Sequence, residues 1–301
     1  MDPQRVFLTG GSGFVGSNVA RVFSERHGAE VVAPSHADVD LVDAAAVRRS
    51  VADARPDAIV HCAILNDLGR LYTHRREAWA AYVGATRNLV ATGVPVVLVS
   101  TDWVFDGTQS GAAEDEPPNP INAYGFLKAV SEVVVDGHGA VARIAGVQGV
   151  HWARPQTPRV QDAGFGYLAA SLVDALRAGR RFTVWEDPAL NSVATPTLAS
   201  DAAEMMWRIV SAGRTGTFHC CGGEAVDRVG LARRTAEVFD LDAELLEVGP
   251  PEPGVVPSVP VPHDTTLDGT ATARALGVEL PGVRTLLERL RDQIDTGRIA
   301  A

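Results

Sequence analysis

A tyrosine and a lysine stand at a spacing that suits proton transfer. Lysine and arginine together number 27, and Lys128 is the only lysine in the sequence. Tyr124 precedes it by four positions in AYGFLKAVSE, so both side chains lie on one face of a helix. A compact ammonium differs from a planar guanidinium where geometry is tight. The spacing predicts a phenol whose pKa is lowered by the neighbouring cation, although a surface lysine on an amphipathic helix is the alternative.

A glycine-rich turn follows the first apolar segment. The expected strand Val6–Thr9 runs into TGGSGFVGSNVARVF, in which Gly10, Gly13 and Gly16 precede apolar residues at helical spacing. Glycines let the backbone approach a pyrophosphate closely, and the helix that follows points its N-terminus at the anion. A glycine triplet alone is a weak signal. Between a first strand and a first helix it predicts a dinucleotide-binding turn.

The end of the second expected strand bears on the choice of cofactor. An acid at this position binds ribose hydroxyls, whereas a basic residue accepts a 2′-phosphate. After Val31–Ala33 the sequence has neither, but places Ser35 and His36 there, with Asp38 and Asp40 further on. His36 is either a partner for a 2′-phosphate or a solvated loop residue. The absence of an acid at the strand end favours NADPH as the cofactor, with NADH as the alternative.

Strands alternate with helices through the first half of the chain. Apolar runs at 58–62, 94–100 and 140–144 are separated by helical patterns at 44–54, 79–91 and from Asn122 onwards. This order predicts an α/β fold, a Rossmann-type doubly wound parallel sheet. Ligands bind such sheets at the carboxyl ends of the strands, where Thr101 follows the fourth strand. Thr101 is therefore a candidate site residue, although an ordinary turn residue would look the same.

Two lobes are expected from the composition. Residues 1–150 read as the dinucleotide-binding domain, and the loop-like stretch after His151 marks the transition. Residues 151–301 are expected to form mainly a smaller C-terminal substrate-binding lobe. A segment at about 180–215 is expected to return to the first domain.

Charge and cysteine usage exclude several classes of function. A formal net charge of −10 argues against nucleic acid or an anionic membrane as the main partner. Three cysteines have neither a disulfide framework nor metal-ligand spacing, so no metal is expected and a reducing compartment is favoured. No stretch is long and apolar enough to span a bilayer. The expectation is a cytoplasmic protein that binds a small molecule.

Together these residues make a coherent site for hydride transfer to a carbonyl. Tyr124 would give its proton to the carbonyl oxygen, and Thr101 would hydrogen-bond the same oxygen and polarise it. Lys128 would lower the phenol's pKa and bind the ribose hydroxyls of the nicotinamide. The cofactor supplies the hydride.

Four motifs carry a family resemblance. TGGSGFVG, STDWVFDG, PxNxYGxxK and TPT resemble those of the extended short-chain dehydrogenase/reductases, and within them the dTDP-4-dehydrorhamnose reductase-like enzymes. The resemblance implies the catalytic set Thr101, Tyr124 and Lys128. It also implies cofactor contacts beyond the glycines and the Ser35–His36 turn, at Phe14, Val15, Asp40, Leu41, Cys62, Ala63 and Ile64. The substrate contacts that we assign on this basis are Thr101, Asp102, Trp103, His151 and Trp152.

The sequence departs from the family pattern at several positions. Tyr82 stands where relatives have Asn on the helix before the fourth strand, and Trp103 stands where the rhamnose enzymes have Tyr. NSVATPT and VPHD also differ from the usual segments of the substrate half. These differences leave the identity of the sugar open.

The resemblance implies an NAD(P)H-dependent reductase of a 4-keto sugar nucleotide or a related ketone, and a homodimer is a further expectation. One alternative is an NAD-dependent sugar-nucleotide epimerase or dehydratase. Another is a non-catalytic, cofactor-binding regulatory subunit, because the beta subunit of methionine adenosyltransferase resembles this family. The intact set of Thr101, Tyr124 and Lys128 favours catalysis.

Overall fold

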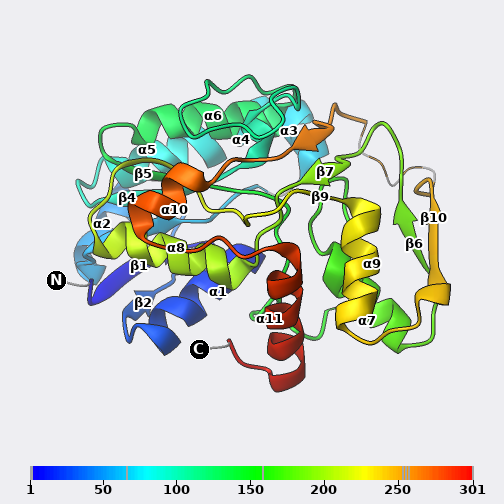
Figure 1. Cartoon of the computed structure of the whole chain (residues 1–301). Helices are drawn as coiled ribbons and strands as arrows, with labels where there is room; N and C mark the ends of the chain where they lie inside the picture. Colours follow the sequence, from blue (N-terminus) through cyan, green and yellow to red (C-terminus); the bar gives the residue numbers. More distant parts are fainter. Residues whose placement is uncertain are drawn as a thin grey trace.

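A six-stranded parallel sheet forms the centre of the molecule (Figure 1). The computed structural model describes residues 3–65, 67–157, 159–252, 254, 256 and 258–299. The strands, in sheet order, are β2 (Glu30–Val32), β1 (Arg5–Thr9), β3 (Ala58–His61), β4 (Val96–Thr101), β5 (Gly139–Ile144) and β8 (Gly216–His219). The chain order reverses between β1 and β3, which is where doubly wound sheets bind ligands. The predicted fold class is confirmed.

Both faces of the sheet are buried, and its side chains alternate between two cores. On β1, Val6 and Leu8 enter one apolar cluster and Phe7 enters the other. On β4, Val97 and Leu98 divide in the same way. Since successive strand residues point to opposite faces, nearly continuous apolar strands are what a sheet covered on both sides requires.

Helices cover the two faces. One face carries α1 (Phe14–Arg21), its π-helical continuation η1 (Val22–Arg26) and α8 (Ala199–Ser211), with α10 (Thr270–Leu276) beside α8. The other face carries α2 (Ala44–Ala54), α5 (Ala85–Val90) and α6 (Ala123–Val135). Asp43 and Asn122 cap α2 and α6 by accepting hydrogen bonds from backbone N–H groups of the first turn. These caps fix where the helices begin.

The helical segment before β4 is longer than expected and irregular. It runs through α3 (Leu68–Thr73), α4 (Arg75–Trp79), the π-helical turn η2 (Ala80–Gly84) and α5. The sequence indicated a helix only from Trp79. Among the described residues, no helix is both long and apolar enough to cross a bilayer.

A second lobe lies beside the sheet, on the right in Figure 1. It contains α7 (Leu168–Arg177), α9 (Arg228–Val238), η4 (Ala243–Leu245) and α11 (Val283–Thr296). Its small sheets pair β6 (Phe182–Trp185) with β10 (Leu246–Gly249), and β7 (Val193–Ala194) with both β9 (Val226–Asp227) and β11 (Asp264–Thr265). Within the segment expected to return to the first domain, α8 covers the large sheet but β6 pairs only with β10. The division at residue 150 stays a prediction.

Candidate active site

The glycine turn packs directly against the turn that follows β3. Gly10 has a φ of 71°, and a Cβ there would lie 2.7 Å from the backbone nitrogen of Ala63. A Cβ on Gly16 would collide with the carbonyl oxygen of Gly10. Helix α1 begins after Gly13, which has no side chain to cap it, so its first N–H groups suit an anion. The turn therefore has the close backbone packing that a pyrophosphate site requires, and pyrophosphate binding there stays a prediction.

Thr9 holds the turn after β3 in place. Its hydroxyl lies 2.7 Å from Nδ1 of His61 and accepts a hydrogen bond from the Ala63 N–H at 3.3 Å. Burial, and then the charge of Lys128, lowers the pKa of His61 to about 3, so this imidazole is neutral. The predicted contacts Cys62, Ala63 and Ile64 thus lie beside the glycine turn.

The turn after β2 is organised by an acid. The Asp38 carboxylate accepts hydrogen bonds from the Ser35 N–H at 2.8 Å and the Ser35 hydroxyl at 2.7 Å. These two bonds lower the pKa of Asp38. Asp40 accepts from the Val42 N–H at 2.9 Å, and Leu41 packs into the core. The Ser35 hydroxyl is therefore engaged with Asp38, while His36 is exposed.

The predicted catalytic residues come together at the carboxyl end of β4. Thr101 ends that strand, and the 3₁₀ turn η3 (Asp102–Val104) follows it. Helix α6 approaches η3 so closely that a Cβ on Gly125 would collide with the Trp103 carbonyl. The Tyr124 ring meets the Trp103 ring edge to face, with centroids 5.9 Å apart.

Tyr124 keeps its proton more firmly than the sequence suggested. Burial raises the pKa of its phenol to about 12, and the charges of Asp102 and Asp162 act in the same direction. A hydrogen bond with Thr101 opposes them. The lowered pKa expected from the spacing is therefore not found, because burial outweighs the contact with Thr101.

The ammonium of Lys128 is buried and points to the sheet. The side chain is 3% exposed, and Nζ donates a hydrogen bond to the Val99 carbonyl at 2.7 Å. Burial lowers its pKa to about 8, while the nearby Cys62 and Glu132 side chains raise it. The alternative of a surface lysine is excluded.

Asp102 is bonded to Thr101. The Thr101 hydroxyl donates to Asp102 Oδ1 at 2.9 Å. Burial raises the pKa of Asp102 to about 6, whereas its hydrogen bonds with Thr265 and Thr101 lower it. Thr101 and Asp102 therefore form a hydrogen-bonded pair at the edge of the sheet, beside the Tyr124 phenol.

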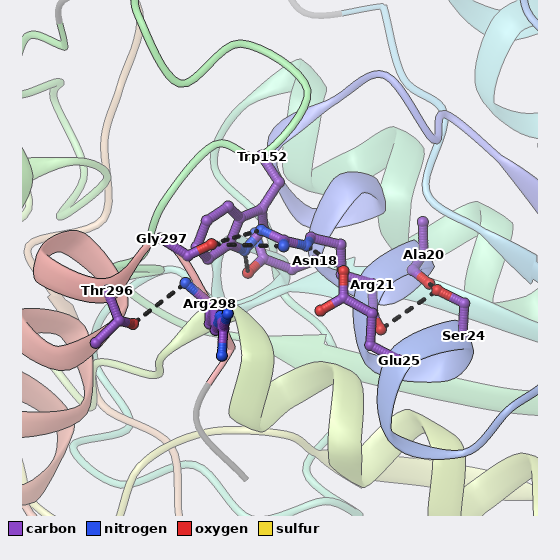
Figure 2. Close-up of polar contacts among 9 residues, drawn as sticks. All are labelled: Asn18, Ala20, Arg21, Ser24, Glu25, Trp152, Thr296, Gly297 and Arg298. Atoms are coloured by element: carbon purple, nitrogen blue, oxygen red, sulfur yellow. Dashed lines mark hydrogen bonds and ion pairs between the residues drawn. The ribbon is translucent and has the colours of Figure 1, made fainter.

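His151 and Trp152 lie against α1. Trp152 Nε1 donates to Asn18 Oδ1 at 3.0 Å, and the Arg21 guanidinium carbon lies 4.0 Å from the Trp152 ring centroid (Figure 2). His151 stacks on Phe14 with centroids 6.0 Å apart. The indole N–H of Trp152 is thus already used. A substrate-binding role for these two residues stays a prediction.

Residues from the second lobe lie beside the candidate site, and no local pattern in the sequence marks them. Asp162 acts on Tyr124 through its charge, and its backbone carbonyl accepts from Nη2 of the buried Arg228 at 3.0 Å. A Cβ on Gly164 would lie 3.4 Å from the Trp103 indole, so this loop covers the aromatic side of the site. Tyr167, at a φ of 59°, packs on Phe14 with centroids 4.5 Å apart. Asp162, Gly164 and Tyr167 lie outside the motifs on which the predicted site was built, so the sequence did not predict them.

The described residues contain no set of side chains that could bind a metal ion. No three His, Cys, Asp or Glu side chains gather there in a way that would hold an ion.

Comparison with known proteins identifies the family to which the chain belongs. The model of the RmlD substrate binding domain family covers residues 4–296. The chain belongs to this family. The family predicted from the motifs is thereby confirmed.

The relatives include reductases and a subunit. A probable low-salt glycan biosynthesis reductase of Haloferax volcanii is 30% identical, covering 80% of this chain and 82% of the relative. The dTDP-4-dehydrorhamnose reductase of Mycobacterium tuberculosis is 28% identical, covering 80% and 77%. The beta subunit of methionine adenosyltransferase 2 from Bos taurus is also 28% identical, covering 81% and 74%.

A solved structure has the same fold. It is a dTDP-4-dehydrorhamnose reductase from Bacillus anthracis in complex with NADP, with a TM-score of 0.79. The identity is 20%, and the match covers 97% of this chain and 100% of that one.

Proposed function

We propose that this protein is an NADPH-dependent reductase of a 4-keto sugar nucleotide. The observation that carries the proposal is the placement of Thr101, Tyr124 and Lys128 beside the glycine turn and the turn after β3. The relatives named reductases, and the NADP in the related structure, support the choice of reaction and cofactor. NADH remains the alternative cofactor.

The residues would divide the chemistry between them. When bound, the cofactor supplies the hydride. The first turn of α1 would bind its pyrophosphate, and Lys128 would lie beside the nicotinamide ribose. Because burial raises the pKa of Tyr124 to about 12, the phenol is protonated at neutral pH and can give its proton to the carbonyl oxygen. Thr101 would hold that oxygen.

At neutral pH this pKa keeps the phenol in the protonated form from which reduction starts. Oxidation of an alcohol needs a phenolate to accept the proton, and burial opposes the phenolate here. A protonated phenol suits the acid that reduction requires. In this structure the Thr101 hydroxyl gives its one proton to Asp102, so Thr101 would hold the substrate oxygen after that O–H turns from Asp102 to the carbonyl.

Replacing Tyr124 by Phe tests the proposal. With dTDP-4-dehydro-6-deoxyglucose and NADPH, turnover should fall by about 10²–10⁴, because general acid catalysis is lost. Binding of NADPH, followed by fluorescence, should be nearly unchanged because only a hydroxyl is removed. Undiminished turnover in Tyr124→Phe would remove the phenol from the reaction.

The same assay separates the alternatives. An epimerase or dehydratase converts its substrate with no net consumption of NADPH, whereas a reductase consumes one equivalent per product. A regulatory subunit, as in the methionine adenosyltransferase relative, would bind NADPH without turning over the keto sugar. Product analysis by mass spectrometry distinguishes the three outcomes.

We also propose a homodimer through the outer face of α6. Phe126 and Val133 on this helix are 51% and 75% exposed, and Trp79 on α4 is 43% exposed. Apolar side chains exposed along the outside of a helix favour association. Sedimentation of Val133→Glu beside the unaltered protein tests this, and a monomer in both cases would end the proposal.

A further inference from the structure

Tyr82 contacts three parts of the candidate site. It lies in the π-helical turn η2 and is 3% exposed. Its ring meets the Tyr124 ring edge to face, with centroids 6.2 Å apart and planes at 80°. The Lys128 ammonium lies 5.7 Å from the centroid of the Tyr82 ring. One side chain therefore touches both members of the predicted proton-transfer pair.

The hydroxyl of Tyr82 reaches the cofactor side. It donates a hydrogen bond to the Leu65 carbonyl at 3.0 Å. Leu65 directly follows Cys62–Ile64, the turn assigned to the nicotinamide side of the cofactor. A single π-helical turn inside a helix often marks a functional position, because the extra residue redirects a side chain. Here that turn carries the tyrosine between α6 and β3.

The electrostatic contribution of the ring follows from burial. The Lys128 ammonium is out of water, and a π face stabilises the charged form of a desolvated cation. Other groups around it are His61 and Cys62 from β3 and its turn, Glu132 from α6, and the Val99 carbonyl of β4. His61 is neutral, so its ring adds no positive charge at neutral pH. Tyr82 thus adds to a short set of groups that favour the ammonium.

We propose that Tyr82 is a positioning residue: its ring holds Lys128 charged and Tyr124 in place, and its hydroxyl fixes the turn after β3. The proposal rests on the proposed function for its catalytic meaning. It gives a role to a position that departs from the family pattern. The electrostatic part can be measured without any turnover.

Because Lys128 is the only lysine, ¹⁵N-labelled lysine gives one side-chain resonance to titrate by NMR. In Tyr82→Leu, the midpoint of Lys128 should fall by about half a unit to one unit, because the ring no longer favours the ammonium. In Tyr82→Phe the ring remains, so the midpoint should match that of the unaltered protein. Tyr72→Phe is the matched control, since it also removes a tyrosine hydroxyl, one that accepts a hydrogen bond from the Ala123 N–H.

Kinetics test the second part of the proposal. Tyr82→Phe should raise the KM for NADPH about threefold to tenfold with little change in kcat, because one neutral hydrogen bond to the turn is lost. Tyr82→Leu should lower kcat about tenfold and move the alkaline limb of the pH–rate profile to lower pH. Tyr72→Phe should change neither.

An unmoved Lys128 midpoint in Tyr82→Leu would overturn the electrostatic role. Equal losses of melting temperature in all variants, with unchanged pH profiles, would reduce Tyr82 to packing and also overturn it. If Tyr82→Leu does not fold, Tyr82→Met takes its place. The Lys128 midpoint should then fall by the amount expected for Tyr82→Leu, because Met also lacks the ring. Full turnover in Tyr124→Phe would instead contradict the proposed function, and the lysine titration would still decide the role of Tyr82.

Discussion

The sheet and the second lobe hold their site residues in different ways. Thr101, Tyr124 and Lys128 are fixed by a strand and a helix whose backbone hydrogen bonds set their positions. In the second lobe, hydrogen bonds between groups distant in sequence set the positions of the residues. Arg228 donates to the Asp162 carbonyl and to Gln161 Oε1, both at 3.0 Å, and Asn191 Nδ2 donates to the His263 carbonyl at 3.0 Å.

The difference predicts where changes are tolerated. A site residue on the sheet is held in one position by regular backbone hydrogen bonds, so even a conservative substitution there should lower turnover strongly. A substrate-side residue lies among loops that can rearrange, so its replacement should change affinity more than turnover. The following experiments test that contrast, from the largest effect to the smallest.

Lys128→Arg should fail nearly as badly as Lys128→Met. The guanidinium keeps the charge, but it is larger and cannot occupy the place of an ammonium bonded to the Val99 carbonyl. We expect kcat to fall by about 10²–10³ in both variants, the usual loss for one electrostatic contact. Steady-state kinetics check this. Recovery of most activity by Arg would show that the position requires only charge.

The buried ammonium should also appear in the pH dependence of stability. Its pKa falls from 10.5 in the unfolded chain to about 8 in the folded protein, so the unfolded state binds more protons between these values. Stability relative to Lys128→Met should therefore rise as pH increases from about 8 to about 10.5, by roughly 3 kcal/mol.

Urea unfolding of both proteins at pH 7.5 and pH 10 measures this change. A difference between the two proteins that does not vary with pH would mean that Lys128 reaches solvent.

Asp38→Ala should shift the cofactor preference towards NADPH. The substitution removes a negative charge and frees the Ser35 hydroxyl that Asp38 now engages. We expect the ratio of kcat/KM for NADPH to that for NADH to rise about tenfold, or roughly 1.4 kcal/mol. Asp187→Ala, which removes a similar turn carboxylate in the second lobe, is the matched control. An unchanged ratio of kcat/KM values would show that the adenosine ribose of the cofactor does not bind beside Asp38.

Trp103→Phe should have the smallest effect. The indole packs on the Tyr124 ring and beside Gly164, and a phenyl ring keeps the edge-to-face contact while leaving space in the loop. The KM for the keto sugar should rise about threefold to fivefold with kcat nearly constant. A larger fall in kcat than rise in KM would assign Trp103 to the catalytic side of the contrast.

The predictable parts of the fold are those with local signals. The bounds of α2 follow from Asp43 at its start and the residues before Pro56 at its end. Asn122 marks the start of α6 in the same way. The pairing of β6 with β10 has no such signal, because it joins segments about sixty residues apart.

The sequence predicted which residues gather at the candidate site on β4 and α6. It did not predict their pKa values. The spacing of Tyr124 and Lys128 placed both on α6, yet only the folded chain reveals how deeply each is buried. Burial decides the pKa of Tyr124, and it depends on Trp103, Tyr82 and the loop of the second lobe. Trp152 is a similar case, since its partner Asn18 lies far away in sequence.

The burial of the only lysine has a practical consequence for following the opening of the molecule. A protease that cuts only after lysine has one peptide bond to cleave in this chain, between Lys128 and Ala129 in α6. That bond is accessible only when the helix detaches from β4 or the whole chain unfolds. The rate at which two fragments appear would therefore measure how often α6 detaches, and a ligand that binds the folded chain would slow it.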